Sequence, residues 1–281
     1  MVPLVIVLAH FLGRNCQVTM KRTPFQIQKA VWLALILREL KTRFGGRLIG
    51  LFWVLIEPLI HIGLMLGLRV ALRDRYVGVM IEPAVYLVVA MVPFFACRNM
   101  WMQGMAAIEA NGGLLGYRQV KPLDAMASRW AMEGILYGFV FVVLSLGFAW
   151  WGYRYFPHQP LEFIGIWALF VMWGIALSMI SAVVGHRRPG VKFFIRASST
   201  PLYLMSGVLI PLSSFPPFIY EYLLWNPFLH LVELSRVYYF ATYVAHHGIN
   251  LEYPLYWGLA LLFVGAVLYH INRIRLLSKT T

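Results

Sequence analysis

The stretch LRELKTRFGGRLIGLFWVLIEP at residues 37–58 changes character halfway along its length. Its first part is rich in charged side chains, namely Arg38, Glu39, Lys41, Arg43 and Arg47. After Gly45 and Gly46 the stretch becomes apolar, and Glu57 and Pro58 lie inside that apolar run. A basic cluster directly before an apolar run is typical of the point where a chain enters a membrane from the cytoplasm.

The composition of the whole chain is that of a membrane protein. Of its 281 residues, 60% are hydrophobic and 12% are charged, and the mean hydropathy is +0.71. Soluble domains are closer to half apolar and about a quarter charged. The net charge of +13 comes from residues at the ends of apolar segments, so membrane anchoring explains it better than binding of nucleic acid. We expect an all-α integral membrane protein that does not bind nucleic acid.

Six apolar segments are candidates to cross the hydrocarbon core of a bilayer, which takes about 20 residues. They cover residues 50–72, 84–105, 127–151, 163–184, 193–210 and 254–271. A further apolar region at 211–243 is interrupted by Glu221, Pro227, Glu233 and Arg236. Such interruptions favour short re-entrant helices that pack against protein. The sequence therefore predicts a transmembrane domain at 48–281 with six spans and a re-entrant segment before the last one.

The distribution of lysine and arginine predicts the orientation. Most of the 24 basic residues lie before the first span, between spans two and three, between spans four and five, and in the tail. The loops on the other side hold fewer, namely Arg69, Arg73, Arg75, Arg154 and Arg236. This excess places both termini in the cytoplasm.

Residues 20–47 predict an amphipathic helix that lies in the inner membrane interface before the first span. Phe25, Val31, Leu35 and Leu40 recur near helical spacing, and charged side chains fall between them. A pair of glycines at 45–46 ends the helix. The residues that we assign to this gate helix are Arg38, Glu39, Lys41, Arg43 and Phe44.

Residues 1–19 fit neither a span nor a signal peptide. The apolar run VPLVIVLAHFLG is too short to cross a membrane, and no basic residue precedes it. Met20 is followed at once by Lys21 and Arg22, as at a natural start. We expect this segment to be either an over-extension of the gene or disordered.

Three blocks of the sequence resemble one family of transporters. The stretch at 37–58 is similar to the entry segment of membrane subunits of type-2 ATP-binding-cassette exporters. The similarity is greatest to the KpsM-like subunits, which export capsular polysaccharide in Gram-negative bacteria. AIEANGGLLGYRQVKPLDAMASR at 107–129 resembles the family's loop between spans two and three, although Gly112 stands where a basic residue is usual. SGVLIPLSSFPP and NPFLHLVELSR, within 206–236, resemble its outer re-entrant segment.

The resemblance implies a half-transporter in the bacterial inner membrane that works as a homodimer. Two copies of a separate ATP-binding cassette subunit would bind ATP and Mg, and the cargo would be a lipid-linked acidic polysaccharide. A periplasmic adaptor and an outer-membrane channel are further implied partners. The chain has no G-x-x-x-x-G-K-[ST], HExxH, CxxC or G-x-S-x-G motif. We therefore expect no catalytic residue, no metal site and no cofactor in this chain.

The segment 114–124 resembles the coupling helix through which such subunits contact their ATPase, and an ordinary cytoplasmic turn is the alternative. The residues assigned to coupling are Leu114, Leu115, Tyr117, Arg118, Gln119, Val120 and Lys121.

Aromatic and charged residues of the first two spans and the loop after the first are candidates to line the substrate path. They are Trp53, Glu57, Arg69, Arg73, Arg75, Phe94, Phe95, Arg98 and Trp101. Aromatic rings stack on the apolar faces of sugars, but an interfacial belt or a lipid-facing core is the alternative for each ring. An arginine within a span faces water, a partner or a ligand. Its alternatives here are an ion pair with Glu57 or Glu133, or snorkelling to the inner interface.

Three other functions compete with capsule export. The same fold exports other glycans, such as O-antigen or teichoic acid. An integral membrane transferase would need convergent carboxylates within the membrane, whereas Glu57 and Glu133 are isolated in the sequence. A solute channel would need no ATPase.

Overall fold

The computed structural model describes residues 23–44, 56–57, 59–64, 67, 83–153, 156–209 and 216–277. Their helices are α2 (Pro24–Phe44), α4 (Pro83–Ala110), α5 (Pro122–Trp150), α6 (Pro160–Val184), α7 (Pro189–Met205), α8 (Pro217–Leu223), α9 (Pro227–Tyr239) and α10 (Glu252–Leu277). No strand occurs within these described ranges, and the all-α class is confirmed. The predicted segment 1–19 lies outside them.

Proline marks where the helices begin. Each of these labelled helices except α10 has proline as its first residue. The first turn of a helix has N–H groups without an intrahelical partner, so the missing N–H of proline costs nothing there, and its fixed φ suits the helix. The proline-rich sequence thereby divides a largely apolar chain into separate helices.

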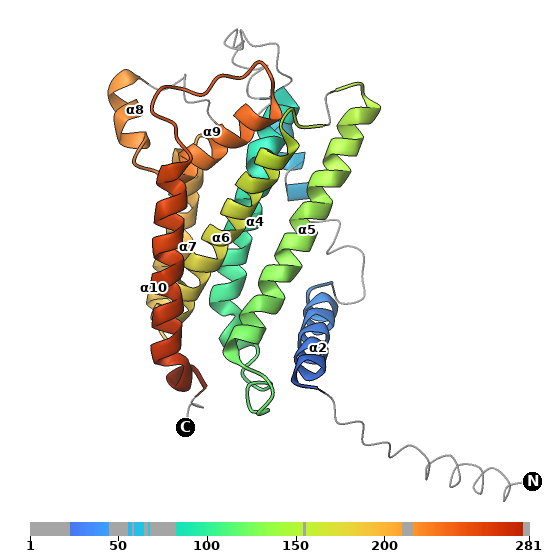
Figure 1. The fold of residues 1–281 in the computed structure, drawn as a ribbon, viewed down its shortest axis with the longest axis vertical. Coiled ribbons are helices and arrows are strands. Elements are labelled where there is room, and N and C mark those ends of the chain that lie inside the picture. The colour runs from blue at the N-terminus through green and yellow to red at the C-terminus, as the bar shows by residue number, and fades with distance from the viewer. Residues whose placement is uncertain are drawn as a thin grey trace, which may run out of the picture.

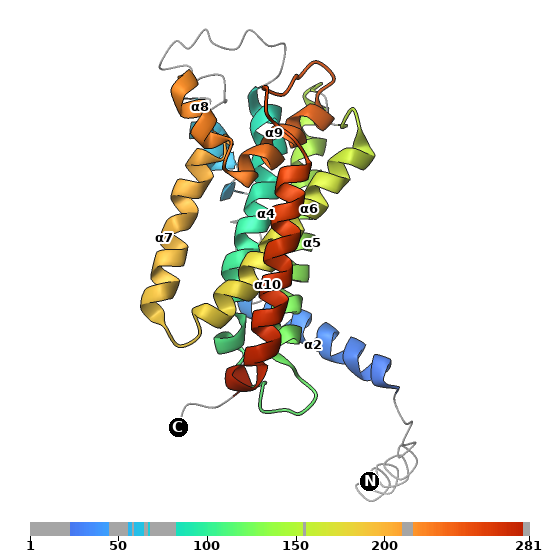
Figure 2. The same cartoon turned by 60° about the vertical axis from the view of Figure 1, so that its left-hand side comes forward.

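The long helices α4, α5, α6 and α10 form a bundle (Figure 1). α4 packs against α5 and α6, and α6 packs against α10. α4 lies at the centre, where Leu87, Met91 and Phe95 are fully buried. When the bundle is turned by 60°, α7 is seen as a separate helix beside it (Figure 2). The core of the protein is therefore built around α4.

Each of the four bundle helices is long and apolar enough to cross a membrane. They correspond to the spans predicted at 84–105, 127–151, 163–184 and 254–271. The span predicted at 193–210 corresponds to α7, which already begins at Pro189 and ends at Met205. Most of the span predicted at 50–72 lies outside the described residues. The total of six spans therefore stays a prediction.

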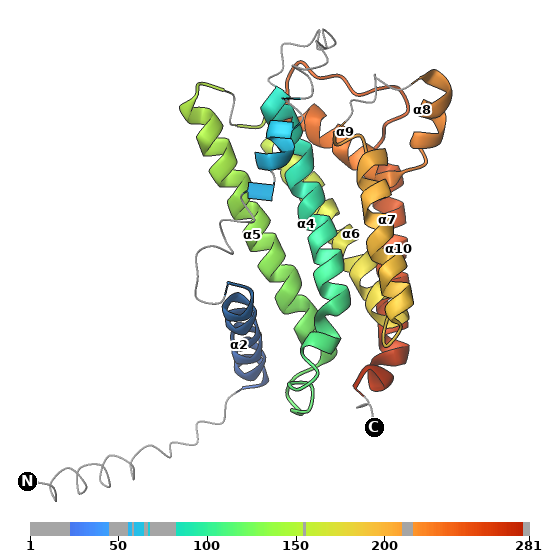
Figure 3. The same cartoon turned by 180° about the vertical axis from the view of Figure 1, so that it is seen from behind.

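The short helices α8 and α9 lie at the end of the bundle opposite to α2 (Figure 3). They occupy the interrupted region predicted at 211–243, and α9 packs against α4, α6 and α10. One expectation was wrong here, because Arg236 is not an outer-loop residue. Its side chain is fully buried within α9, where Glu233 accepts a hydrogen bond from it at 2.9 Å.

Candidate functional site

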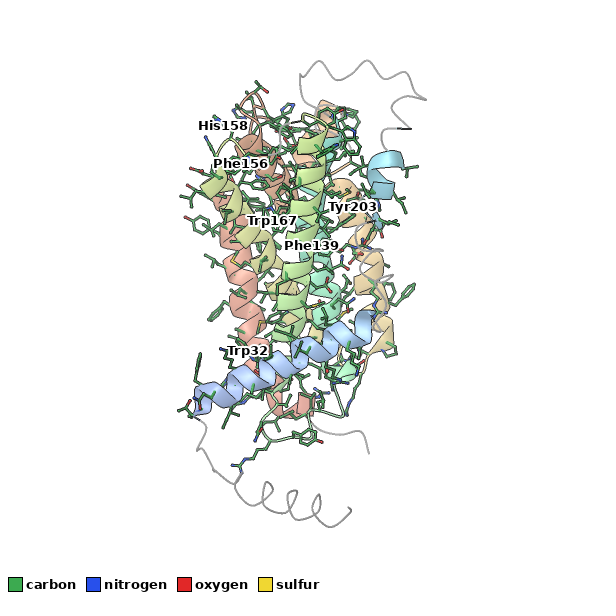
Figure 4. All side chains as sticks on the ribbon, turned by 90° about the vertical axis from the view of Figure 1, so that its right-hand side faces the viewer. Trp32, Phe139, Phe156, His158, Trp167 and Tyr203 are labelled. Carbon is green, nitrogen blue, oxygen red and sulfur yellow. The ribbon has the colours of Figure 1, made fainter. Side chains whose placement is uncertain are left out.

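Helix α2 crosses the bundle obliquely at one end, as Figure 4 shows, and packs against α5. Leu35 is buried in this contact, whereas Trp32, Leu33 and Leu37 are about half exposed. The exposed apolar side chains are what a helix at a membrane surface requires. The predicted helix is thus present, and its position in the interface stays a prediction.

Asp124 joins α2 to the first turn of α5. Its Oδ1 accepts hydrogen bonds from Gln28 Nε2 at 2.5 Å and from Trp32 Nε1 at 2.9 Å. Its Oδ2 accepts a hydrogen bond from the backbone N–H of Lys121 at 2.9 Å. A carboxylate in the first turn of a helix is stabilised by the unpaired N–H groups and by the helix dipole. One buried side chain therefore holds α2, α5 and the end of the loop that precedes α5.

A second polar network connects the predicted gate helix with the other end of the same loop. Glu39 Oε1 accepts hydrogen bonds from Arg129 Nε at 3.0 Å and from Asn111 Nδ2 at 3.2 Å. Arg38 donates to Asn111 Oδ1 at 2.7 Å, and Arg129 also donates to the carbonyl of Gln103 at 2.9 Å. Two of the predicted gate residues thus contact the start of the α4–α5 loop. Lys41 is exposed, and the side chains of Arg43 and Phe44 lie outside the described part.

The predicted coupling segment forms consecutive turns between α4 and α5, and not a helix. The backbone N–H groups of Leu114, Tyr117 and Val120 donate to carbonyls three residues earlier, at 2.8, 3.1 and 3.0 Å. Three glycines at 112, 113 and 116 disfavour a helix there, since each costs roughly 0.5–1 kcal/mol relative to alanine. The exposed residues of the segment are Tyr117, Arg118, Gln119 and Lys121, and the half-buried ones are Leu114, Leu115 and Val120.

Three of the predicted path residues lie in the core of the chain. Phe94 and Phe95 are buried, and the centre of each ring lies 5.4 Å from that of Tyr203. Trp101 is 9% exposed and donates from Nε1 to Ser181 Oγ at 2.7 Å. Within a single chain these three side chains pack against protein. Four further candidates lie outside the described residues, namely Trp53, Arg69, Arg73 and Arg75.

Arg98 belongs to a polar stripe on α4 that is only half buried. Its neighbours in the stripe are Asn99, which donates to Tyr137 Oη at 2.7 Å, and Gln103. The guanidinium carbon of Arg98 lies 5.9 Å from the centre of the Phe95 ring. Among the residues that the structure describes, no ion pair joins Arg98 to Glu57 or Glu133. The structure therefore does not show the ion-pair alternative in this chain.

Asp124 and Asn111 were not predicted as site residues. Asp124 carries a local signal, because it stands at the third helical position after a Lys-Pro pair. Asn111 carries none, because its partners Arg38 and Glu39 are more than 70 residues away in the sequence. Contacts between such distant residues require the packing of α2 on the bundle.

Long apolar helices with an attached helix at one end define a multi-pass membrane protein. The sequence profile of the ABC-2 type transporter family matches residues 30–240, so the chain belongs to that family. It is a membrane subunit of a transporter and not an enzyme in its own right.

Relatives within the family are named for transport of capsule glycans. The chain is 34% identical over 261 residues to the polysialic acid transport protein KpsM of Escherichia coli, covering 92% of this chain and 100% of the relative. It is 29% identical over 244 residues to the capsule polysaccharide export inner-membrane protein CtrC of Neisseria meningitidis, covering 85% and 89%. It is 27% identical over 247 residues to the capsule polysaccharide export inner-membrane protein BexB of Haemophilus influenzae, covering 86% and 91%.

Proposed function

We propose that this chain is the membrane subunit of an ATP-driven exporter that moves lipid-linked capsular polysaccharide across the bacterial inner membrane. The observation that carries the proposal is the similarity over 92% of the chain to a polysialic acid transport protein. Polysialic acid is an acidic glycan, and an acidic cargo agrees with candidate path residues that include four arginines. Export of another glycan by the same fold is the alternative.

Two copies of the chain and two ATP-binding cassette subunits make up the proposed core complex, with both termini of the chain in the cytoplasm. The partner subunits bind ATP and Mg, and this chain needs no cofactor. A periplasmic adaptor and an outer-membrane channel complete the export route. The family membership of the chain supports the partnership with an ATP-binding subunit.

The α4–α5 loop is the proposed contact with the ATP-binding subunit. Tyr117, Arg118 and Gln119 are exposed at its tip, as a docking segment requires. Asn111 and Asp124 lie at its two ends, and both accept hydrogen bonds from α2. A shift of the loop during ATP hydrolysis would therefore displace α2, the proposed gate helix at the membrane surface.

Replacement of Tyr117–Lys121 by a Gly/Ser linker tests this proposal. We expect the variant to insert into the membrane at the level of the native chain, to lose capsule export, and to lose co-purification with the ATP-binding subunit. The matched control is H246S/H247S, which changes two exposed residues in the loop at the opposite end of the bundle. Normal export by the linker variant would remove the assignment of this loop to coupling.

A further inference from the structure

Two adjoining cavities lie where α4, α6, α7 and α10 meet, at the same end of the bundle as α2. The larger, of about 680 Å³, lies between residues 112–116, residues 186–189 and the last turn of α10. The smaller, of about 320 Å³, lies between the end of α6 and α10. His186, Arg187, Arg188 and Leu276 line both cavities. We call the two cavities together the α6–α7 pocket.

The α6–α7 pocket combines cationic and apolar walls. Its cationic lining residues are Arg187, Arg188, Lys192 and Arg275, and its apolar ones include Ile108, Leu115 and Leu276. Glu109 is the one carboxylate among the described lining residues. It forms an ion pair with Lys192 and accepts a hydrogen bond from the backbone N–H of Arg187 at 3.1 Å. The described lining residues therefore carry an excess of positive charge, and a pocket with such charges beside apolar walls suits an anionic group attached to hydrocarbon.

In the α6–α7 loop, the backbone N–H groups of Arg187 and Arg188 already donate, to Glu109 Oε1 and to the carbonyl of Gly185. α7 begins at Pro189, and the side chain of Arg188 at its N-cap makes no capping hydrogen bond. Arg187 has a φ of 57°, in the left-handed region that residues other than glycine seldom adopt. Burial, and next the neighbouring charge of Arg187, lower the pKa of His186, which disfavours the charged form of this ring. The cationic side chains are therefore the groups of the pocket that would meet an anionic ligand.

The predicted ends of the spans place the pocket at the depth of the lipid headgroups. The predicted spans end at residue 105 on α4 and residue 271 on α10, so Glu109 and Leu276 lie roughly 6–8 Å beyond the hydrocarbon at 1.5 Å per residue. The headgroup layer is roughly 5–8 Å thick on each side of the bilayer core. Phe193 and Phe194, which follow Lys192 directly, are 68% and 73% exposed.

We propose that the α6–α7 pocket binds the phosphate group of an anionic lipid in the inner leaflet. Basic pockets between helices on the cytoplasmic side recognise such headgroups. The phosphate would lie against Arg187 and Arg188, and the glycerol and first acyl carbons against Ile108 and Leu276. The lipid is either bulk phospholipid or the phosphate-bearing lipid anchor of a cargo. The proposal depends on the membrane position of the helices and not on the identity of the glycan.

A bound lipid would also touch the proposed coupling segment. Gly112, Leu115 and Gly116 line the larger cavity, whereas Tyr117 projects away as an exposed side chain. An acidic segment of the ATP-binding subunit is the rival occupant. The predicted headgroup depth of the cavity favours the lipid, because the loop between α4 and α5 extends further along the bundle axis than the turn between α6 and α7 (Figure 2).

Native mass spectrometry of the purified complex measures the proposed binding. The probes are dioleoylphosphatidylglycerol and the zwitterionic dioleoylphosphatidylcholine, added to wild type and to R187Q/R188Q. We expect wild type to bind the anionic lipid preferentially and the double variant to bind it about tenfold more weakly, because each basic side chain contributes to attraction of anionic lipid. The control is R196Q/R273Q, which removes two exposed basic residues that line neither cavity. Equal binding by wild type and R187Q/R188Q, or equal binding of both lipids, would overturn the proposal.

Preparation from two cell types separates the lipid sources. Retention of a phosphate-bearing lipid in cells with and without glycan synthesis indicates bulk phospholipid, and retention only with synthesis indicates the cargo anchor. Loss of the ATP-binding subunit from R187Q/R188Q with unchanged lipid binding would instead assign the pocket to protein docking and overturn the proposal. A photo-crosslinking phosphatidylglycerol tests wild type directly, and we expect labelled peptides that contain residues 186–192 or 272–277. Labelling only elsewhere would contradict the proposal even if the double variant failed to assemble.

Discussion

Two polar networks lie at opposite ends of the bundle and differ in their exposure to solvent. At the α9 end, the Arg236 guanidinium donates to Glu233 and to the carbonyl of Val208 at 3.0 Å, and it lies 3.8 Å over the Tyr86 ring. Both charged side chains are at most 1% exposed. At the α2 end, the exposed fractions of the Arg129 and Glu39 side chains are 12% and 14%.

Because of this difference in burial, we expect the ion pair at the α9 end to cost more free energy to break than the ion pair at the α2 end. If a fully buried pair loses one partner, the other remains as an uncompensated charge in a medium of low dielectric constant. Water can replace a lost partner at the α2 end, so opening those contacts costs less. The α9 network is therefore the more costly of the two to open and the α2 network the less costly, as the proposed gate role of α2 requires.

The largest expected effect comes from Arg236→Ala. Removal of one partner of a buried ion pair costs about 3–5 kcal/mol, so the variant should fail to assemble or should melt far below wild type. Thermal unfolding of the purified protein in detergent measures this. The double variant E233Q/R236M should recover part of the lost stability, because it leaves no unpaired charge. A wild-type melting temperature for Arg236→Ala would show that the buried pair does not hold α9.

A smaller effect is expected for Glu39→Ala at the other end. The variant loses hydrogen bonds from Arg129 and Asn111 to a charged group, which costs about 1.5–3 kcal/mol at most and acts on α2 alone. Labelling of cysteines placed along α2 should increase while the bundle keeps its melting temperature. Lys41→Ala is the control, since Lys41 is exposed on the same helix. Unfolding of the whole bundle by Glu39→Ala would contradict the separate behaviour of α2.

Trp32→Phe should weaken the attachment of α2 less than Glu39→Ala does. It keeps the aromatic ring and removes one hydrogen bond to Asp124, where Gln28 remains as a donor. The expected cost is about 0.5–1.5 kcal/mol, visible as slightly faster labelling of α2. An effect as large as that of Glu39→Ala would show that Asp124, and not Glu39, is the main attachment of α2.

Arg98→Ala should change stability least, because Arg98 is half buried and no ion pair joins it to Glu57 or Glu133 in the described part of the chain. If Arg98 contacts the cargo, the variant should assemble and hydrolyse ATP but export poorly, and Arg98→Lys should restore part of the export. The two measurements are the amount of capsule on whole cells and the ATPase activity of the purified complex. Lost assembly, rescued by a charge swap with Glu57 or Glu133, would instead indicate a structural pair.

The sequence predicts the helices well because their signals are local. Apolar runs gave the approximate positions of α4, α5, α6 and α10, and the interruptions at Glu221 and Pro227 gave the short helices. The glycines at 112, 113 and 116 also disfavour a coupling helix, yet the family resemblance led us to expect one. In this case the local composition was the better guide.

The contacts of charged residues could not be predicted in the same way. Arg236 looks like an outer-loop residue in the sequence, and only the packing of α9 against α4, α6 and α10 shows that it is buried. The Glu39–Arg129 pair joins residues 90 positions apart. The α6–α7 pocket likewise needs the ends of α4, α6 and α10 to meet the start of α7, which no periodicity in the sequence reveals.

Transport by purified components tests the central claim most directly. Proteoliposomes that contain this chain and its ATP-binding subunit would be supplied with lipid-linked acidic polysaccharide on the side of the ATP-binding subunit, and glycan protected from an added glycosidase would be measured. The account predicts protection that requires ATP, requires both subunits and is lost when Tyr117–Lys121 is replaced by the linker. Protection without ATP, or active ATP hydrolysis by a complete complex that protects no glycan, would contradict it.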